Sequence, residues 1–196
     1  MDYRAFTLLN GLTGHGFDGL FILLAKDLAA VLMVLVALAF VVGGARQRAG
    51  AVLGTAAAAL ALLAGQPLSH AVARMRPYAA HPGHAHLLIA RSQDFSFPSD
   101  HAVGAFALAF GLWLYDRTLG GALLVVATVL ALSRVVVGTH YPGDVLAGAA
   151  IGADVSGGLF AAPITRRACE RFAERAGALW DRVPSRIGRS AGASRP

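Results

Sequence analysis

Three short segments of the chain carry residue types that suit phosphoryl transfer. They are Arg74-Met75-Arg76-Pro77, then Phe97-Pro98-Ser99-Asp100-His101, and then the stretch from Ser133-Arg134 to His140-Tyr141-Pro142-Gly143-Asp144. The planar guanidinium of arginine matches phosphate oxygens and offsets the charge that develops on them. A neutral histidine can attack phosphorus, and a second histidine can protonate the leaving oxygen. Together these segments predict a site that acts on a phosphate group.

The third segment is the most informative of these stretches. Proline is favoured at the first position of a helix, so Pro142 predicts a helix with Asp144 in its first turn. From there we expect the Asp144 carboxylate to reach back to His140, fix its tautomer and leave the other ring nitrogen free to attack. Arg134, near the end of the preceding apolar run, is expected to point into the same pocket.

The second segment predicts an anion site at a helix start. Pro98 precedes Ser99, which is a good N-cap residue, and His101 then falls in the first turn of an apolar helix. The free backbone N–H groups and the positive end of such a helix attract phosphate. A phosphate bound there would lie beside His101.

Composition indicates that these segments belong to a membrane protein. Hydrophobic residues make up 56% of the 196 residues and charged residues only 14%, against about 45–50% and about 25% in soluble domains. The net charge is +6, which raises the alternative of a nucleic-acid-binding protein. The basic residues, however, stand in short loops and a tail between long apolar runs, as the positive-inside rule describes. We therefore expect membrane lipids and no nucleic acid as partners.

The apolar runs predict an all-α bundle of six transmembrane spans. The expected spans are residues 5–24 (an imperfect span, or alternatively a helix partly in the interface), Leu28–Gly44, Ala49–Leu68, about Ala102–Tyr115, a fifth span up to Val137, and about Val145–Ala162. One long polar loop, residues 69–99, separates the third and fourth spans. Residues 1–164 are thus predicted to form the transmembrane domain.

Residues 165–196 are predicted to form a basic cytoplasmic tail. Apolar residues at helical spacing, among them Phe172 and Leu179, indicate an amphipathic helix on the inner membrane surface, and residues 188–196 are expected to be disordered. If six spans alternate, Arg46, Arg48 and Arg117 share the cytoplasmic side with this tail. The polar loop and the 134–144 segment then meet at the outer face of the membrane.

The three segments resemble the signature of the type 2 phosphatidic acid phosphatase superfamily. That signature reads lysine, six residues and Arg-Pro; Pro-Ser-Gly-His; and Ser-Arg, five residues, His, three residues and Asp. The third part matches fully here, and the second departs only at Asp100, which replaces glycine. The first matches only at Arg76-Pro77, because Ser69 stands at the lysine position.

The resemblance implies a role for each matching residue. His140 would be the nucleophile that forms a phosphohistidine, Asp144 its orienting partner, His101 the general acid and later base, and Arg76, Arg134 and Ser99 the phosphate-binding groups. Arg74 is a further candidate for binding phosphate, in place of the missing lysine. We expect no metal or other cofactor, because cationic side chains take the metal's usual place.

Within the superfamily, the chain resembles bacterial undecaprenyl-diphosphatases of the bacitracin-resistance type. The short chain, Asp100 and the N-terminal stretch TLLNGLTGHGFDGL carry this likeness. It implies hydrolysis of undecaprenyl diphosphate to undecaprenyl phosphate and inorganic phosphate, which recycles the cell-wall lipid carrier. The alternatives are another lipid phosphate (phosphatidate, phosphatidylglycerol phosphate or a polyprenyl-phosphoryl sugar phosphate) or a non-enzymatic transporter of lipid phosphates.

For several polar residues, the sequence allows both a functional and a purely structural interpretation. His81, His84 and His86 form a metal site or, as we favour, a solvated loop. Asp154 lies within the last span, where a carboxylate is costly; we favour a residue that faces the bundle and bonds to serine or backbone. Asp94, with Arg91, is a candidate for headgroup binding or for a surface ion pair.

Overall fold

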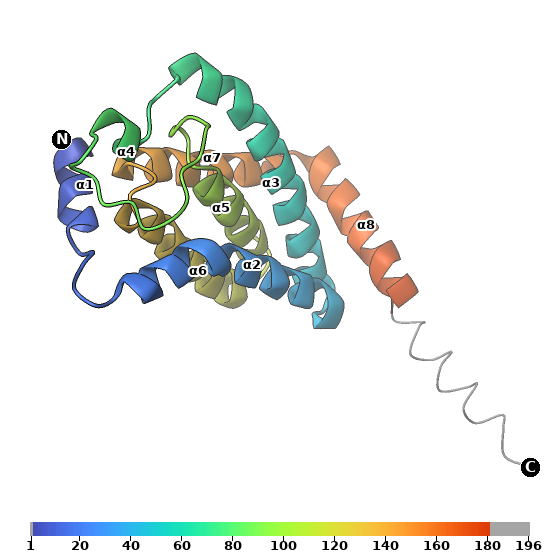
Figure 1. Cartoon of the computed structure of the whole chain (residues 1–196). Coiled ribbons are helices and arrows are strands. Elements are labelled where there is room, and N and C mark those ends of the chain that lie inside the picture. Colours follow the sequence, from blue (N-terminus) through green and yellow to red (C-terminus); the bar gives the residue numbers. More distant parts are fainter. Residues whose placement is uncertain (1, 181–196) are drawn as a thin grey trace, which may run out of the picture.

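The computed structural model describes residues 2–180, which form helices and no strand (Figure 1). The helices are α1 (Asp2–Asn10), α2 (Asp18–Val42), α3 (Ala45–Val72), α4 (Pro77–Ala80), α5 (Asp100–Trp113), α6 (Arg117–Val136), α7 (Pro142–Ala161) and α8 (Pro163–Trp180). The all-α prediction is confirmed for the described residues.

The central helix of the bundle is α5, which packs against α2, α3, α6 and α7. Small residues let its neighbours approach closely. A Cβ atom added to Gly111 of α5 would stand 2.4 Å from the Gly54 Cα of α3. On the side that faces α7, a Cβ added to Gly152 would stand 2.4 Å from the Val103 carbonyl oxygen. Such contacts between helix backbones are a common mode of packing in membrane bundles.

Local sequence sets where the helices that carry the motifs begin. The Asp116 carboxylate accepts two backbone N–H groups of the first turn of α6, at 3.1 and 3.0 Å, and so caps that helix. As predicted, α7 begins at Pro142 with Asp144 in its first turn. Ser99 is the N-cap residue of α5, also as predicted, but its hydroxyl makes no capping bond.

Four helical stretches are long and apolar enough to cross a membrane, and the predicted count of six is not confirmed. They are Asp18–Val42, Ala45–Ala80, Arg117–Val136 and Pro142–Ala161. The central helix α5 has only 14 residues, a length of about 21 Å at 1.5 Å per residue. It runs between the same two ends of the bundle, with other helices packed around it.

The predicted first span at residues 5–24 is wrong. The first helix ends at Asn10, and α2 begins at Asp18 and continues through most of the second predicted span. Gly14 and Gly16 turn the chain between these helices, with φ angles of 81° and 87°. Glycine adopts this left-handed region at little cost. As a result, α1 lies at one end of the bundle, beside α6 and α7 (Figure 1).

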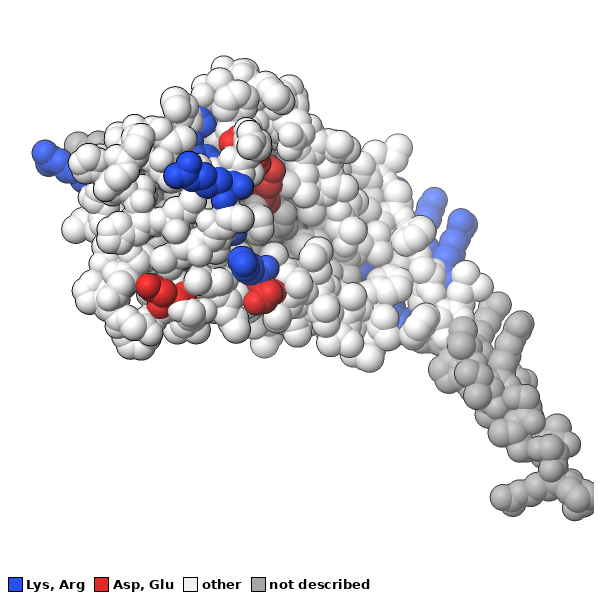
Figure 2. All heavy atoms as spheres, in the orientation of Figure 1, with Lys and Arg blue, Asp and Glu red and all other residues white. Residues whose placement is uncertain are grey.

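Charged residues are divided between the two ends of the bundle. Arg46, Arg48 and Arg117 lie where α2 joins α3 and α5 joins α6, whereas loop 73–99 and the α6–α7 connection lie at the opposite end. On the face drawn in Figure 2, charged side chains gather toward the ends, with an uncharged belt between them. The arginine pattern predicted this separation. That the motif-bearing end faces out of the cell stays a prediction.

The helix α8 packs mainly against α3 near the arginine-rich end. Ala173 and Gly177 face the bundle and are buried, while Phe172 and Leu179 are exposed. The helix extends as far as Trp180, with these apolar side chains exposed. Its position on a membrane surface stays a prediction, and residues 181–196, with the predicted disorder at 188–196, lie outside the described residues.

The prediction that Asp154 faces the bundle and bonds to serine or backbone is wrong. Asp154 is exposed on α7. The bundle-facing position is taken by the buried Ser156, whose hydroxyl donates to the Ala107 carbonyl oxygen of α5 at 2.9 Å. Two residues correspond to about 200° of helix rotation, so Asp154 points away from the bundle.

Gly111→Ala should lower the free energy of unfolding by about 1–3 kcal/mol, because an extra methyl group at a filled contact forces the backbones apart. Thermal unfolding in detergent measures this. Gly121→Ala in α6 is the matched control, since a Cβ atom there meets nothing within 4 Å; alanine should leave stability unchanged or raise it slightly. Equal unfolding temperatures for the two variants would contradict the close contact of α3 with α5.

Candidate active site

The three motif segments meet at one end of the bundle, where helices begin or end. Arg76 directly precedes α4, Ser99 and His101 begin α5, Arg134 is in the last turn of α6, and His140 and Asp144 flank the start of α7. The Nη1 atom of Arg76 lies 3.1 Å from Nε2 of His140. The Ser99 N–H donates to the Asp144 carbonyl oxygen at 3.1 Å. The predicted meeting of the segments is therefore observed.

The imidazole of His140 is buried and held in one orientation. Its exposed fraction is 2%, and its Nδ1 lies 2.8 Å from the Ser96 carbonyl oxygen. A carbonyl can only accept, so Nδ1 carries the hydrogen and Nε2 carries a lone pair. Burial and the guanidinium groups of Arg76 and Arg134 hold the pKa of His140 well below its ordinary value. The ring is thus a neutral base whose Nε2 faces the arginine.

The prediction that Asp144 bonds directly to His140 is wrong. Asp144 Oδ2 lies 3.9 Å from His140 Nδ1, beyond hydrogen-bond distance. The same Oδ2 instead accepts the Ser96 hydroxyl and the Tyr141 N–H. Ser96 thus contacts both groups: its hydroxyl donates to Asp144 and its carbonyl accepts from His140. Nothing in the sequence pattern distinguishes Ser96, since it holds His140 through a carbonyl group that every residue has.

Arg74 pairs with two carboxylates at the motif-bearing end of the bundle. Its guanidinium donates to Asp144 Oδ1 at 2.7 Å and to Asp2 Oδ2 at 2.6 Å, and it stacks on the Tyr141 ring at 3.9 Å. The expectation that Arg74 replaces the family lysine in binding phosphate stays a prediction. Two of its five N–H groups are occupied by these carboxylates, which hold the guanidinium beside Asp144.

Two buried polar atoms in the described part of the chain lack a hydrogen-bond partner: the Ser99 hydroxyl and Nε of Arg134. Buried polar groups nearly always have partners, so such atoms mark a place where a ligand can bind. Arg134 is otherwise anchored by its Nη1, which donates to the Ala25 carbonyl oxygen at 3.0 Å. With Arg76, these residues offer several donors to an anion that has several oxygens. They are the residues predicted to bind phosphate.

Asp94 forms an ion pair with Arg76. Its Oδ1 accepts from Nη2 at 3.0 Å, and its carbonyl oxygen accepts from Nε at 3.2 Å. The Asp94 side chain is 57% exposed, whereas the Arg76 side chain is 7% exposed. A solvated loop carboxylate therefore holds a buried arginine of the candidate site. Of the two readings of Asp94, the ion pair is observed, but with Arg76 rather than Arg91.

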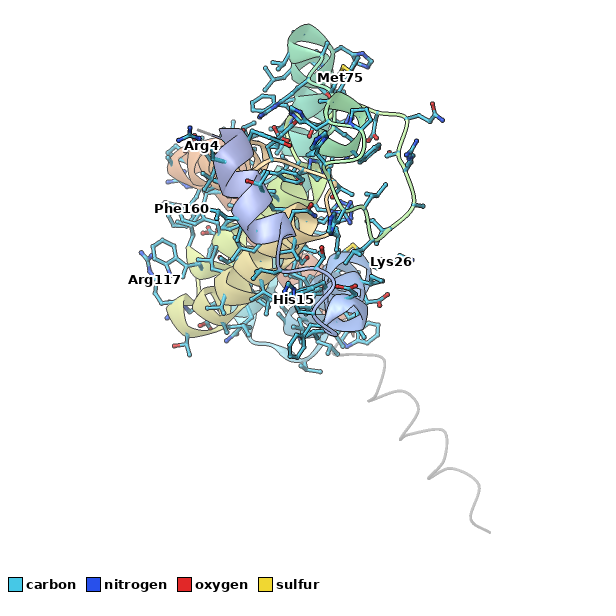
Figure 3. All side chains as sticks on the ribbon, turned by 60° about the vertical axis from the view of Figure 1, so that its left-hand side comes forward. Arg4, His15, Lys26, Met75, Arg117 and Phe160 are labelled. Carbon is cyan, nitrogen blue, oxygen red and sulfur yellow. The ribbon has the colours of Figure 1, made fainter. Side chains whose placement is uncertain are left out.

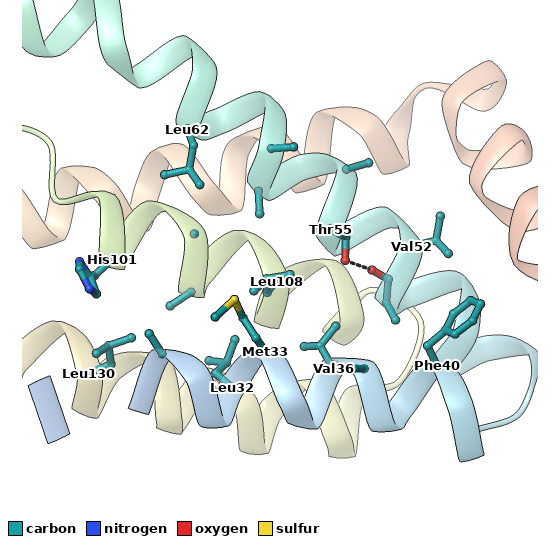
Figure 4. A pocket seen from close by; sticks show the side chains of 18 of the residues that line it. Leu32, Met33, Val36, Phe40, Val52, Thr55, Leu62, His101, Leu108 and Leu130 are labelled. Atoms are coloured by element: carbon teal, nitrogen blue, oxygen red, sulfur yellow. Dashed lines mark hydrogen bonds between the residues drawn. The ribbon is translucent and has the colours of Figure 1, made fainter. Parts of the chain in front are cut away.

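The histidine of the second motif lies where the site meets an apolar groove. This groove, of about 980 Å³, runs along α5 between α2 and α3 (Figure 4). His101 and Asp100 line one end, and Phe172 of α8 lines part of it farther along. Apart from Thr55, whose hydroxyl donates to the Ala51 carbonyl at 2.8 Å, the other lining residues are apolar. The groove thus connects a motif histidine to a surface that suits hydrocarbon.

The histidine-rich stretch does not converge on a common point. His81 stacks on Tyr3 with ring centroids 3.9 Å apart, His84 contacts the Pro82 carbonyl, and Nδ1 of His86 lies 2.9 Å from the Thr13 hydroxyl. Within residues 2–180, no group of three histidine, cysteine or acidic side chains is arranged to hold a metal ion. The loop interpretation is thus the one that the geometry supports.

Comparisons with known proteins agree with this arrangement. The model of the PAP2 superfamily matches residues 49–167, which include all three motif segments. The chain is 32% identical to undecaprenyl-diphosphatase BcrC of Bacillus subtilis, over 82% of each chain. It is 36% identical to the putative undecaprenyl-diphosphatase YbjG of Escherichia coli, over 76% of this chain and 75% of that one. The crystal structure of Aquifex aeolicus LpxE shares the fold, with a TM-score of 0.63 and 22% identity, and the match covers 79% of this chain and 92% of that one.

Asp94→Asn should tighten the binding of inorganic phosphate, because Asp94 competes with an anion for Arg76. The gain should stay below about fivefold, since exposed ion pairs contribute up to about 1 kcal/mol. Isothermal titration of the purified protein at fixed ionic strength measures it. Asp27→Asn is the control for the change in net charge, because Asp27 is exposed on α2. Unchanged or weaker phosphate binding by Asp94→Asn alone would contradict the competition.

Proposed function

Because the chain belongs to the PAP2 superfamily of membrane lipid phosphatases, we propose that it hydrolyses undecaprenyl diphosphate to undecaprenyl phosphate and inorganic phosphate. The observation that carries the proposal is a charged site and an apolar groove that share the start of α5. A neutral His140 faces Arg76 at 3.1 Å, and an apolar groove runs from His101 along the bundle. The site thus places phosphate-binding groups at the end of a surface for a lipid chain.

In the first step of the proposed mechanism, Nε2 of His140 attacks the terminal phosphorus. The bond from that phosphorus to the bridging oxygen breaks, and His101 gives its proton to the departing lipid phosphate. The terminal phosphate oxygens take up the donors of Arg76, Arg134 and Ser99, two of which have buried atoms without another partner. The product of this step is a phosphohistidine at His140.

In the second step, His101 accepts a proton from a water molecule as that water attacks the phosphohistidine. The phosphorus–nitrogen bond breaks, inorganic phosphate leaves, and His140 returns to the neutral form that its burial favours. Burial keeps the pKa of His140 low, which makes its nitrogen available at neutral pH. His101 thus alternates between acid and base, as two-step hydrolysis requires.

The substrate enters from the membrane in this proposal, with its headgroup at the motif-bearing end and its chain in the groove. That end faces out of the cytoplasm of a bacterial cell, since the opposite end holds Arg46, Arg48, Arg117 and the arginines of α8. The names of BcrC and YbjG favour undecaprenyl diphosphate over other lipids. A lipid-phosphate transporter is the second candidate, because arginines alone suffice to bind a headgroup.

The proposed substrate is tested by release of inorganic phosphate from a panel of lipids by the purified protein in detergent micelles. Undecaprenyl diphosphate should give the highest kcat/KM, above phosphatidate, phosphatidylglycerol phosphate and a polyprenyl-phosphoryl sugar phosphate. A different lipid at the top of the panel would replace the substrate and leave the chemistry in place. Release of phosphate from none of them would contradict the enzymatic proposal.

His140→Ala and His101→Ala should each lower kcat by at least about 100-fold, because nucleophile and proton-transfer partner are both needed for turnover. A transporter would tolerate both changes. Rapid quench with substrate labelled at the terminal phosphate should trap an acid-labile phosphoprotein in the wild type and none in His140→Ala. The exposed loop residue His84 supplies the control, and His84→Ala should retain full activity. Wild-type turnover by His140→Ala would refute the mechanism.

A further inference from the structure

We infer that Arg74 and Asp2 are positioning residues that hold the His140 ring in line for attack, an inference that rests on the proposed function. Arg74 links the two carboxylates: its Nη2 donates to Asp2 at 2.6 Å and its Nη1 to Asp144 at 2.7 Å. Neither Arg74 nor Asp2 occupies a position of the family signature. Arg74 does, however, bond to Asp144, which occupies such a position and lies close to the nucleophile.

The first link is the ion pair between Arg74 and the fully buried carboxylate of Asp144. Asp144 is 0% exposed, and Arg74 is the cation that pairs with it among the described residues. An ionised carboxylate without a partner is costly to bury. The pairing therefore gives the carboxylate a countercharge and fixes its orientation, with Oδ1 on the arginine and Oδ2 accepting from Ser96 and the Tyr141 N–H.

The second link connects the Asp144 carboxylate to the ring of His140. The hydroxyl of Ser96 bonds to Asp144, and the carbonyl of the same residue receives the Nδ1 hydrogen of His140 at 2.8 Å. Rotation of the carboxylate would move Ser96 and so remove the contact that fixes the imidazole. Arg74 also lies on the face of the Tyr141 ring. Tyr141 directly follows His140 in the chain. Two routes thus connect Arg74 with the catalytic ring of the proposed mechanism.

Helix α1 completes this set of contacts among Asp2, Arg74 and Asp144, which we call the clamp. The second oxygen of Asp2 accepts the Gly143 N–H in the first turn of α7 at 2.9 Å, so Asp2 holds the arginine and the α7 start together. A Cβ atom on Gly143 would stand 2.9 Å from the Asp2 carboxylate, so a larger residue there would push this carboxylate aside. The fully buried Phe6 packs edge-on to Tyr141 with centroids 5.6 Å apart. A helix without a motif thus supports the site.

The alternative assignment is that Arg74 binds the substrate phosphate directly. The two assignments predict different kinetics. A substrate ligand contributes to binding, so its loss raises KM and the inhibition constant of inorganic phosphate together. A positioning residue acts on the attack, so its loss lowers the rate at saturation and leaves both constants nearly unchanged.

The test compares Arg74→Met, Arg74→Lys, Asp2→Asn and Arg4→Met in detergent, using undecaprenyl diphosphate and, as inhibitor, inorganic phosphate. Arg4 is the matched control, because it is an exposed arginine on α1 that points away from the bundle (Figure 3). Single-turnover rates with enzyme in saturating excess are decisive, since an inactive fraction does not alter them. We expect Arg74→Met to slow this step by about 10- to 100-fold, the cost of a misplaced reacting group.

Partial rescue should follow from Arg74→Lys, which restores the positive charge that faces Asp144. Asp2→Asn should slow the single turnover less than Arg74→Met does, because the Arg74–Asp144 pair survives. KM and the phosphate inhibition constant should change by less than about threefold in all of these variants. Arg4→Met should match the wild type.

Two results would overturn the inference: an unchanged single-turnover rate in Arg74→Met, or a joint rise of KM and the phosphate inhibition constant. If Arg74→Met fails to fold, Asp2→Asn decides, since Asp2 is partly exposed and its loss leaves Asp144 paired; a wild-type rate would then reject the clamp. Failure of the proposed function looks different, because the wild type itself would release no phosphate. If another lipid is the substrate, the same comparison applies to it.

Discussion

The buried carboxylate of Asp144 is the contact on which the geometry of the site depends. It accepts from Arg74, which follows α3, from Ser96, which precedes α5, and from the backbone at the start of α7. Three parts of the chain that are distant in sequence are therefore held at one point. Because the carboxylate is fully buried, water cannot replace a lost partner, and the loss of any one bond leaves a buried polar group without full compensation.

The site needs this junction because its other charged groups repel one another. Arg76 and Arg134 both lower the pKa of His140, so like charges gather where the proposed phosphate binds. The protein offsets part of this repulsion with Asp94, which pairs with Arg76 from the solvent side. The small-residue contacts of α5 with α3 and α7 then keep the helix ends that carry these groups in place. The close packing of the core thus holds in place the charged groups that repel one another at its end.

The sequence predicted the residues that lie in the motifs and where their helices begin. Pro142 and Asp144 open α7, and Ser99 stands at the start of α5, because these preferences are local. The pairing of Arg74 with Asp2 was not predicted, since spacing cannot reveal a contact with a residue so distant in the chain. Ser96 was missed for a related reason: a backbone carbonyl leaves no trace in residue type.

The first span was mispredicted because hydropathy alone cannot separate one span from a short helix followed by a long one. Gly14 and Gly16 break the run between α1 and α2. The consequence is functional as well as topological. A chain segment that spanned the membrane could not bring Asp2 to α7, whereas a short helix at the bundle end can. The glycines that end the apolar run therefore make α1 available to the site, and they explain how a segment without a family motif contacts the residues that have one.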